Sequence, residues 1–181
     1  GNANTSIAGG INVYGADISV AGNISASSAG ILLKAAGNIT NSAGVSGTPR
    51  TISASNGPIT FWAGSGGNGY TLIANYTTVS SGGGAVKFGG GTGPTIGTNN
   101  TSNATYSAIQ FGTSIVANNS VQILSGDGDI SIDGKSSALS GVKIYPGTKI
   151  AAAGLITING ESTATWGISN STGSSTNSDT Y

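Results

Sequence analysis

Residues 11–41 decide the fold, and they read INVYGADISVAGNISASSAGILLKAAGNITN. Short groups of Ile, Val and Leu alternate with polar residues and are separated by Gly, Asn and Ser, which is typical of very short β-strands joined by tight turns. No segment carries apolar residues at helical spacing over three turns, and Gly recurs too often for a helix of useful length. The sequence therefore predicts an all-β protein with essentially no helix.

Apolar positions recur along this stretch and beyond it about every 20 residues. Two columns follow this spacing, one through Ile11, Leu32, Ile52 and Leu72 and one through Ile18, Ile39, Ile59 and Val79, and Ile24 and Val45 begin a third. A chain that returns to the same place every 20–21 residues, with three short strands per circuit, forms a parallel β-helix. About eight coils at the spacing of strands in a sheet would make a rod about 40 Å long.

Three similar phrases mark the expected corners of the coil: Gly22-Asn23-Ile24, Gly37-Asn38-Ile39 and Gly128-Asp129-Ile130. Gly and Asn adopt positive φ angles or tight turns at low steric cost, so we expect them on the bend. The Ile would then open the next strand and point inward. Ser and Thr at the alternate positions suit a solvated outer surface.

We expect one solenoid over residues 1–168, with an irregular Gly-rich insert at about 80–106 and a low-complexity tail or linker at 169–181. Within the insert only the group around Val86 and Phe88 has the pattern of a strand. The coil is expected to resume after it, because residues 109–115 resemble 142–150 and residues 130–137 resemble 156–163. The start at Gly1 rather than Met indicates a processed product, a fragment or a subunit of a longer assembly.

Composition excludes several classes of function. The 181 residues include no Cys and no His, which removes disulfides, thiolate metal sites and the commonest general base. Six basic and six acidic residues give no net charge and no basic stripe for nucleic acid. No apolar run reaches the roughly 18 residues of a membrane span, so we expect no transmembrane segment. No cofactor is expected.

Several phrases resemble the strand repeats of filamentous-haemagglutinin-like bacterial surface proteins. They lie at residues 22–26, 36–41, 51–63 and 128–132, and the resemblance covers roughly residues 8–168. It implies a right-handed parallel β-helix, secretion across the outer membrane through a dedicated partner pore, and an extracellular location at the bacterial cell surface. It also implies a role as an adhesin or as a stalk that holds an adhesive tip.

The expected function is therefore a non-enzymatic structural or adhesive rod. Its partner would be a cell-surface glycan or protein receptor, or further copies of itself joined end to end. Two alternatives stay open: a subunit of a self-assembling extracellular filament, which would use the unpaired strands at each end, and a β-helix carbohydrate-active protein.

Candidate site residues are few. Asp127, Asp129 and Asp133 form the only carboxylate cluster; they are weak candidates for a calcium site or a glycosidase pair, and the alternative is that they are ordinary turn residues. Trp62, Tyr70 and Tyr76, with Tyr106 and Tyr145, are candidates for a glycan-stacking strip, and the alternative is that they cover open corners. Phe61 precedes Trp62, so one of these two must face outward in a strand.

Asn-x-Ser/Thr sequons are frequent. They are Asn4, Asn23, Asn38, Asn75, Asn99, Asn100, Asn103, Asn118 and Asn170. A chain so rich in Asn, Ser and Thr produces many such sequons by accident, but some adhesins of the resembling class are glycosylated on Asn. We therefore keep all nine as glycosylation candidates.

Overall fold

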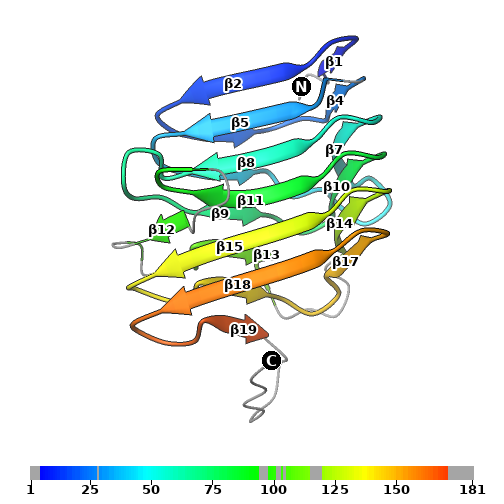
Figure 1. Ribbon diagram of the computed structural model, residues 1–181. Coiled ribbons are helices and arrows are strands. Elements are labelled where there is room, and N and C mark those ends of the chain that lie inside the picture. The colour runs from blue at the N-terminus through cyan, green and yellow to red at the C-terminus, as the bar shows by residue number, and fades with distance from the viewer. Residues whose placement is uncertain are drawn as a thin grey trace.

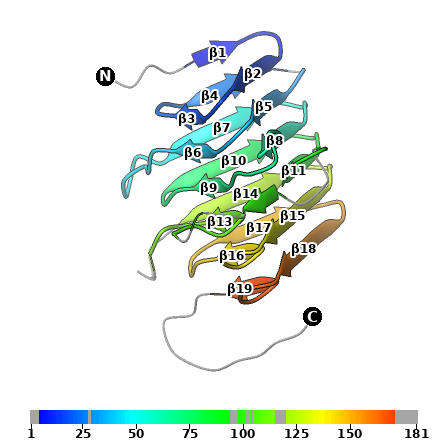
Figure 2. The same cartoon turned by 90° about the vertical axis from the view of Figure 1, so that its left-hand side faces the viewer.

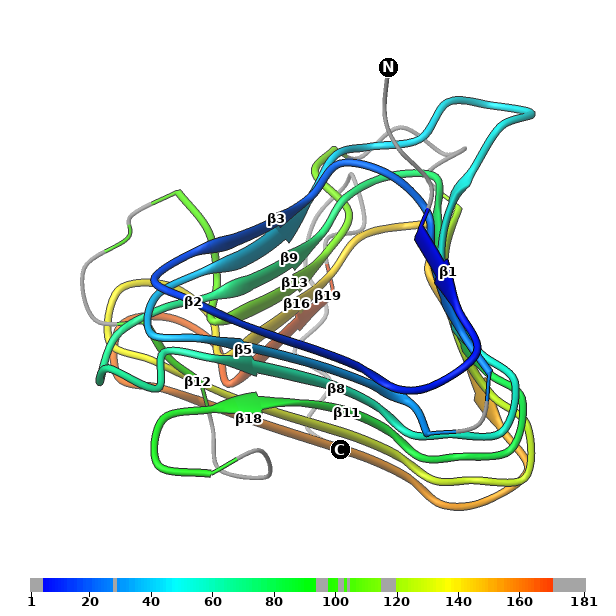
Figure 3. The same cartoon turned by 90° about the horizontal axis from the view of Figure 1, so that it is seen from above.

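The computed structural model describes residues 5–27, 29–93, 98–100, 103, 105–114 and 120–170. The chain winds through three strands per coil, and the coils stack along one axis from the N-terminal end to the C-terminal end (Figure 1). Viewed down this axis from the N-terminal end, the chain runs clockwise as it moves away from the viewer (Figure 3), so the coil is right-handed. The predicted all-β class and three-stranded right-handed parallel β-helix are confirmed.

Each side of the coil is one parallel sheet (Figure 2). Sheet A holds β1 (Thr5–Ile7), β4 (Ile24–Ala26), β7 (Arg50–Ala54), β10 (Thr77–Ser81), β14 (Val121–Ser125) and β17 (Lys149–Ala152). Sheet B holds β2 (Ile11–Gly15), β5 (Ile31–Ala35), β8 (Ile59–Ala63), β11 (Val86–Gly90), β12 (Thr98–Asn100), β15 (Ile130–Ser136) and β18 (Ile156–Ser162). Sheet C holds β3 (Ile18–Val20), β6 (Ile39–Asn41), β9 (Thr71–Ile73), β13 (Ile109–Phe111), β16 (Val142–Ile144) and β19 (Ile168–Asn170).

The core is built from columns of aliphatic side chains, and each coil contributes one side chain to a column. In sheet B the column runs through Ile11, Ile31, Ile59, Val86, Ile130 and Ile156. Its central members are completely buried. Burial of each such side chain contributes about 1.5–3 kcal/mol, and β-branched residues suit the extended backbone. Few apolar residues per coil are therefore enough to hold a chain of modest hydrophobicity together.

The three corner phrases occupy three different corners, and in each the Ile opens a strand as predicted. The Asn or Asp oxygen accepts a hydrogen bond from a backbone N–H of the next coil. These bonds join Thr51 N to Asn23 Oδ1 (2.9 Å), Tyr70 N to Asn38 Oδ1 (3.2 Å) and Leu155 N to Asp129 Oδ1 (2.8 Å). A corner amide that would otherwise lack a partner is thus satisfied, and adjacent coils are tied together.

Of the two conformations expected at these corners, a positive φ angle or a tight turn, the three phrases do not use the first. Among the described residues, positive φ occurs at other glycines and at Tyr76, and not within the three corner phrases. Two of their glycines lie close to the coil before them: a Cβ on Gly37 would lie 2.5 Å from Asp17 Oδ1, and one on Gly128 would lie 2.5 Å from the carbonyl carbon of Gly84. At Gly128 the stacked backbone leaves no room for a side chain, whereas at Gly37 the Asp17 side chain would have to move.

The predicted coil length holds only for the first full turn. Ile31 follows its partner Ile11 by 20 residues and Ile39 follows Ile18 by 21, whereas later coils need 26 to 44 residues to return to the same position of sheet B. The proposed columns mix faces, since Ile52 lies in sheet A and Leu72 in sheet C. The described strands make six coils rather than eight, or about 29 Å of stacked sheet.

The boundaries of the predicted insert and tail also need correction. Residues 77–90 are regular: β10 and β11 pair in register with β7 and β8, and Gly82 and Gly84 pack on the corner of the coil before them. The departure begins after Gly91: Gly90 and Gly93 form an antiparallel bridge, and β12 pairs with the part of β15 that β11 does not reach. The solenoid ends later than predicted, because β19 extends to Asn170.

Candidate functional site

The three aromatic residues singled out from the sequence do not form one strip. Trp62 lies on the outer face of sheet B, in β8. Tyr70 directly precedes β9, at the corner between sheets B and C, and Tyr76 directly precedes β10, at the corner between sheets C and A. The alternation in β8 is as predicted: Phe61 is completely buried and Trp62 faces outward.

Tyr70 serves the corner itself. Its ring packs against Tyr106 with 5.0 Å between ring centroids and 32° between the ring planes. Burial raises the pKa of the Tyr70 hydroxyl above its usual range, and the neighbouring Tyr106 and Asp17 raise it further. The raised pKa means that folding favours the neutral hydroxyl of Tyr70. The neutral hydroxyl therefore contributes to the stability of the fold below pH 10, and this contribution is lost as the pH rises through the raised pKa. Tyr70 and Tyr106 therefore cover a corner.

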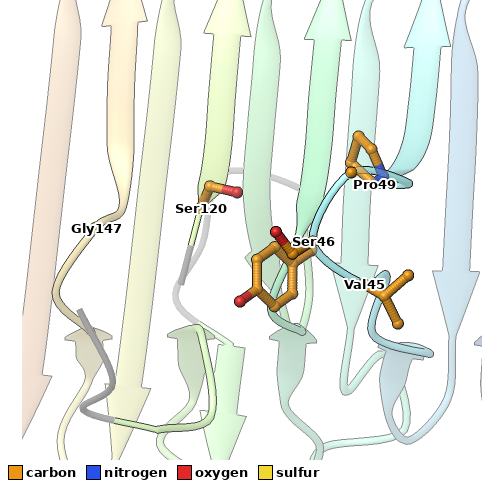
Figure 4. Close-up of a pocket in the computed structure, with 7 residues that line it drawn as sticks. Val45, Ser46, Pro49, Ser120 and Gly147 are labelled. Atoms are coloured by element: carbon orange, nitrogen blue, oxygen red, sulfur yellow. The ribbon is translucent and has the colours of Figure 1, made fainter. Parts of the chain in front are cut away.

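Tyr76 lines a groove at the corner between sheets C and A. The groove encloses about 560 Å³. Its walls are uncharged and consist of Val45, Ser46, Gly47, Pro49, Tyr76, Ser120 and Gly147. Val45 and Pro49 stand on one side, and Ser120 and Gly147 on the other (Figure 4). Such a groove offers hydroxyl groups, an aromatic ring and glycine backbone to a neutral polar ligand.

The backbone of Tyr76 has a φ of 53°, a left-handed conformation that costs a bulky residue about 1–2 kcal/mol. Two hydrogen bonds explain why Tyr76 adopts this conformation. The carbonyls of Asn75 and Tyr76 accept from Gly44 N (3.0 Å) and Arg50 N (2.8 Å), the two ends of the loop that forms one wall. Consecutive carbonyls must turn toward the two ends of this loop, which holds the wall of the groove in place.

A second groove, of about 220 Å³, lies on the outer face of sheet B. It is lined by Asn12, Ala29, Ile31, Leu32, Pro58, Thr60 and Trp62. Its residues come from three successive coils, because Asn12, Leu32 and Thr60 are in register on β2, β5 and β8. Asn12 and Leu32 were not predicted as site residues; their outward positions in alternating strands are the signal that points to them.

The indole of Trp62 is fixed at the edge of this groove. Its Nε1 donates a hydrogen bond to the carbonyl of Gly91 (2.9 Å), and the strand residue beside it in the next coil is Gly89. Gly89 has no side chain, which leaves room for the ring to lean toward that coil. On the other side, Lys34 Nζ lies 3.7 Å from the centre of the indole ring, within the range of a cation–π contact.

The three aspartates are not brought together as a metal site. Asp127 and Asp129 lie at the corner between β14 and β15, and Asp133 lies on the outer face of β15. Asp133 accepts hydrogen bonds from Ser131 Oγ (2.6 Å) and Asn159 Nδ2 (2.7 Å), while Asp129 caps the next coil. Within the described ranges no group of three or more acidic, His or Cys side chains could hold a metal ion. The weak metal candidates are thus separate residues, and two of them hold coils together.

The sequons differ in how accessible their Asn side chains are to glycosylation. Asn4 and Asn118 lie outside the described residues, as does the side chain of Asn99. Asn100 is only 1% exposed and its amide organises the loop that follows, with bonds to Asn103 and Tyr106, so it cannot carry a glycan in this fold.

The remaining five sequons keep some exposure. Asn23, Asn38, Asn75 and Asn103 are half-buried and use Oδ1 to accept backbone hydrogen bonds. Asn170, at the end of β19, is exposed. On exposure alone, Asn170 is the sequon most open to modification among those described.

The described residues form a three-sided parallel β-helix that carries the grooves beside Tyr76 and Trp62. Comparison with protein-family models, curated proteins and solved structures found no match for the chain. In the part that the structure describes, no helix is long and apolar enough to cross a membrane.

Proposed function

We propose that the chain is a non-enzymatic rod segment of an extracellular bacterial surface protein, which projects or forms a binding surface. The observation that carries this proposal is the uninterrupted stack of inward columns over six coils. In such a solenoid each coil contacts only its neighbours, so length and stiffness come from repetition of one unit. The loops at two corners can vary without disturbing the stack, which suits a rod that displays binding surfaces.

The use of the acidic side chains supports a structural role. Asp17, Asp129 and Asp133 accept hydrogen bonds from the next coil, and Glu161 forms an ion pair with Lys135 of the preceding coil (3.0 Å). Carboxylates engaged in this way join neighbouring coils. Secretion through a partner pore and a location at the bacterial surface belong to the same proposal and are supported by the resemblance of the repeats.

Adhesion of beads that carry the isolated chain tests this function. We expect the beads to be retained under flow on at least one surface of a panel of cells and immobilised glycans, and the chain to release no product from those glycans. Beads that carry the chain after urea denaturation are the matched control. Retention equal to that control would contradict the adhesive role, and turnover that Asp129→Asn abolishes would favour the carbohydrate-active alternative.

A second candidate function, assembly into a filament, is favoured by the end coils of the described stack. Ile7 is 44% exposed, and at the other end Ile156 and Ile168 are 40% and 45% exposed. Unpaired strand edges with apolar neighbours are sites of strand addition. Sedimentation of the isolated chain separates the two proposals: a monomer at all concentrations supports the rod segment, and an SDS-resistant ladder supports the filament.

A further inference from the structure

The outer face of sheet B concentrates groups that recognise a charged sugar. We propose that the groove beside Trp62 binds an acidic saccharide, that is, a sugar ring bearing a carboxylate. This inference rests on the proposed adhesive function and names the ligand class of one surface. It rests on the lining of the groove, the fixed indole and two lysines that form no ion pair among the described residues.

The groove combines an apolar floor with free hydrogen-bonding groups. Leu32 lies in register between Asn12 and Thr60 and is half-buried, so its side chain is available to the C–H face of a sugar ring. Within the described part of the chain, neither the Asn12 amide nor the Thr60 hydroxyl has a hydrogen-bond partner. These two groups can therefore donate to and accept from sugar hydroxyls.

The indole of Trp62 forms a wall whose orientation is set before a ligand arrives. The hydrogen bond from Nε1 to the Gly91 carbonyl fixes the ring, and the strand that carries Trp62 is a central strand of sheet B. An aromatic ring held in this way loses little conformational freedom on binding. Tyr14, which is 66% exposed, continues the aromatic surface on the far side of Lys34.

Charge selects an acidic sugar over a neutral one. Lys34 and Lys87 lie on the two strands that flank β8, in register with Trp62 and Thr60 respectively. In the described residues neither lysine takes part in an ion pair, whereas Lys135 on the same face is paired with Glu161. Lys34 contacts the Trp62 ring but has no anionic partner, and a neutral sugar would leave both ammonium charges without one. A carboxylate would complement them and would be attracted to this half of the face.

Titration with oligogalacturonate tests the inference, and the same oligomer with its carboxylates methyl-esterified is the matched ligand. The chain has two tryptophans, so in a Trp166→Phe background the fluorescence reports Trp62 alone. We expect a saturable fluorescence change with the acidic oligomer and a lower affinity as the salt concentration rises. The affinity for the ester should be lower than that for the acid by a factor of about ten or more. The double variant Lys34→Gln/Lys87→Gln should lose about tenfold in affinity.

One control variant and one test variant keep the outcome unambiguous. The control, Lys135→Gln/Lys149→Gln, changes the net charge equally but away from Trp62 and should leave the affinity unchanged. Thr60→Val removes a hydroxyl that lines the groove and should weaken binding without loss of fold. Absence of a saturable change, equal affinity for the ester, or an equal loss in the control pair would each overturn the inference. Bead retention by a variant that binds no saccharide would leave the proposed function standing, so the two failures are distinguishable.

Discussion

Replacement of Phe88 by Ala is expected to lower the free energy of unfolding by about 3–5 kcal/mol, which is a large share of the stability of a domain. Phe88 is completely buried and lies between two other rings. It stacks on Phe61 at 4.6 Å with 5° between the planes, and it meets Phe111 edge-on at 5.1 Å. Because Phe111 belongs to sheet C, the truncation removes contacts within sheet B and between two sides of the coil.

Urea unfolding followed by circular dichroism measures this effect. Lys87→Ala is the matched control, because Lys87 is the neighbouring residue on the outer face. This substitution should change the free energy of unfolding by no more than about 0.5 kcal/mol. Phe88→Leu should fall between the two, because it leaves a smaller cavity. Equal midpoints for Phe88→Ala and Lys87→Ala would contradict the placement of this ring in the interior.

Gly82→Ala is expected to destabilise the protein by about 3 kcal/mol, although Ala is normally the better residue in a folded backbone. A Cβ on Gly82 would lie 1.7 Å from the carbonyl oxygen of Ser55 in the preceding coil. A Cβ on Gly126, the counterpart of Gly82 in the following coil, would lie 2.0 Å from the carbonyl oxygen of Gly82. The added methyl group meets backbone rather than a movable side chain, so the stacked coils must separate.

Gly9→Ala provides the comparison for this prediction. Gly9 lies at the corresponding corner of the first coil, where a Cβ would meet nothing within 4 Å. We expect this variant to unfold at the same urea concentration as the parent protein or at a slightly higher one. If both glycine variants behave alike, close approach between successive coils does not limit the residue at position 82.

The strands and the corners could be predicted because each is marked by a local sequence pattern that is typical of one structure. Alternation of Ile with Ser or Thr requires strands with one buried face, and the Gly-Asx-Ile phrases mark corners. Direct comparison of segments gave the correct register in the C-terminal half: Ile109 pairs with Val142 and Ile130 with Ile156, as the similarity of these segments predicts. There the aligned segments are whole strands with their turns, so a slip by one residue is excluded.

The register of the first coils could not be read from a fixed period. Ile31, Leu32 and Leu33 are all apolar, so the spacing alone does not show which of them stacks on Ile11. Loops of different lengths at two corners then shift the phase. The corner between sheets A and B varies least. Ile24 and Ile31, Ile52 and Ile59, Val79 and Val86, and Ile123 and Ile130 are each seven residues apart, and the equivalent positions of the first and last coils, Thr5 and Ile11 and Ile150 and Ile156, are six apart.

Prediction of the candidate binding surface requires the register of the strands, whereas prediction of the fold does not. Alternation predicts that one of Phe61 and Trp62 faces outward, and the structure shows that it is Trp62. Its neighbours Lys34 and Gly89 lie 28 residues before it and 27 after it, so their proximity follows only from the pairing of β5, β8 and β11. The separation of Trp62, Tyr70 and Tyr76 has the same cause, because Trp62 lies on the face of sheet B and the two tyrosines lie at two different corners.

Distances between spin labels along one column of sheet A test the in-register stack most directly. The chain has no Cys, so labels can be placed at Ser6, Leu124 and Ala151, which are linked by register through every coil. Ser6 lies four strand spacings from Leu124 and five from Ala151. We expect backbone separations of about 19 Å and 24 Å, which differ by one strand spacing. Equal distances, or a shorter distance from Ser6 to Ala151 than to Leu124, would contradict the parallel β-helix.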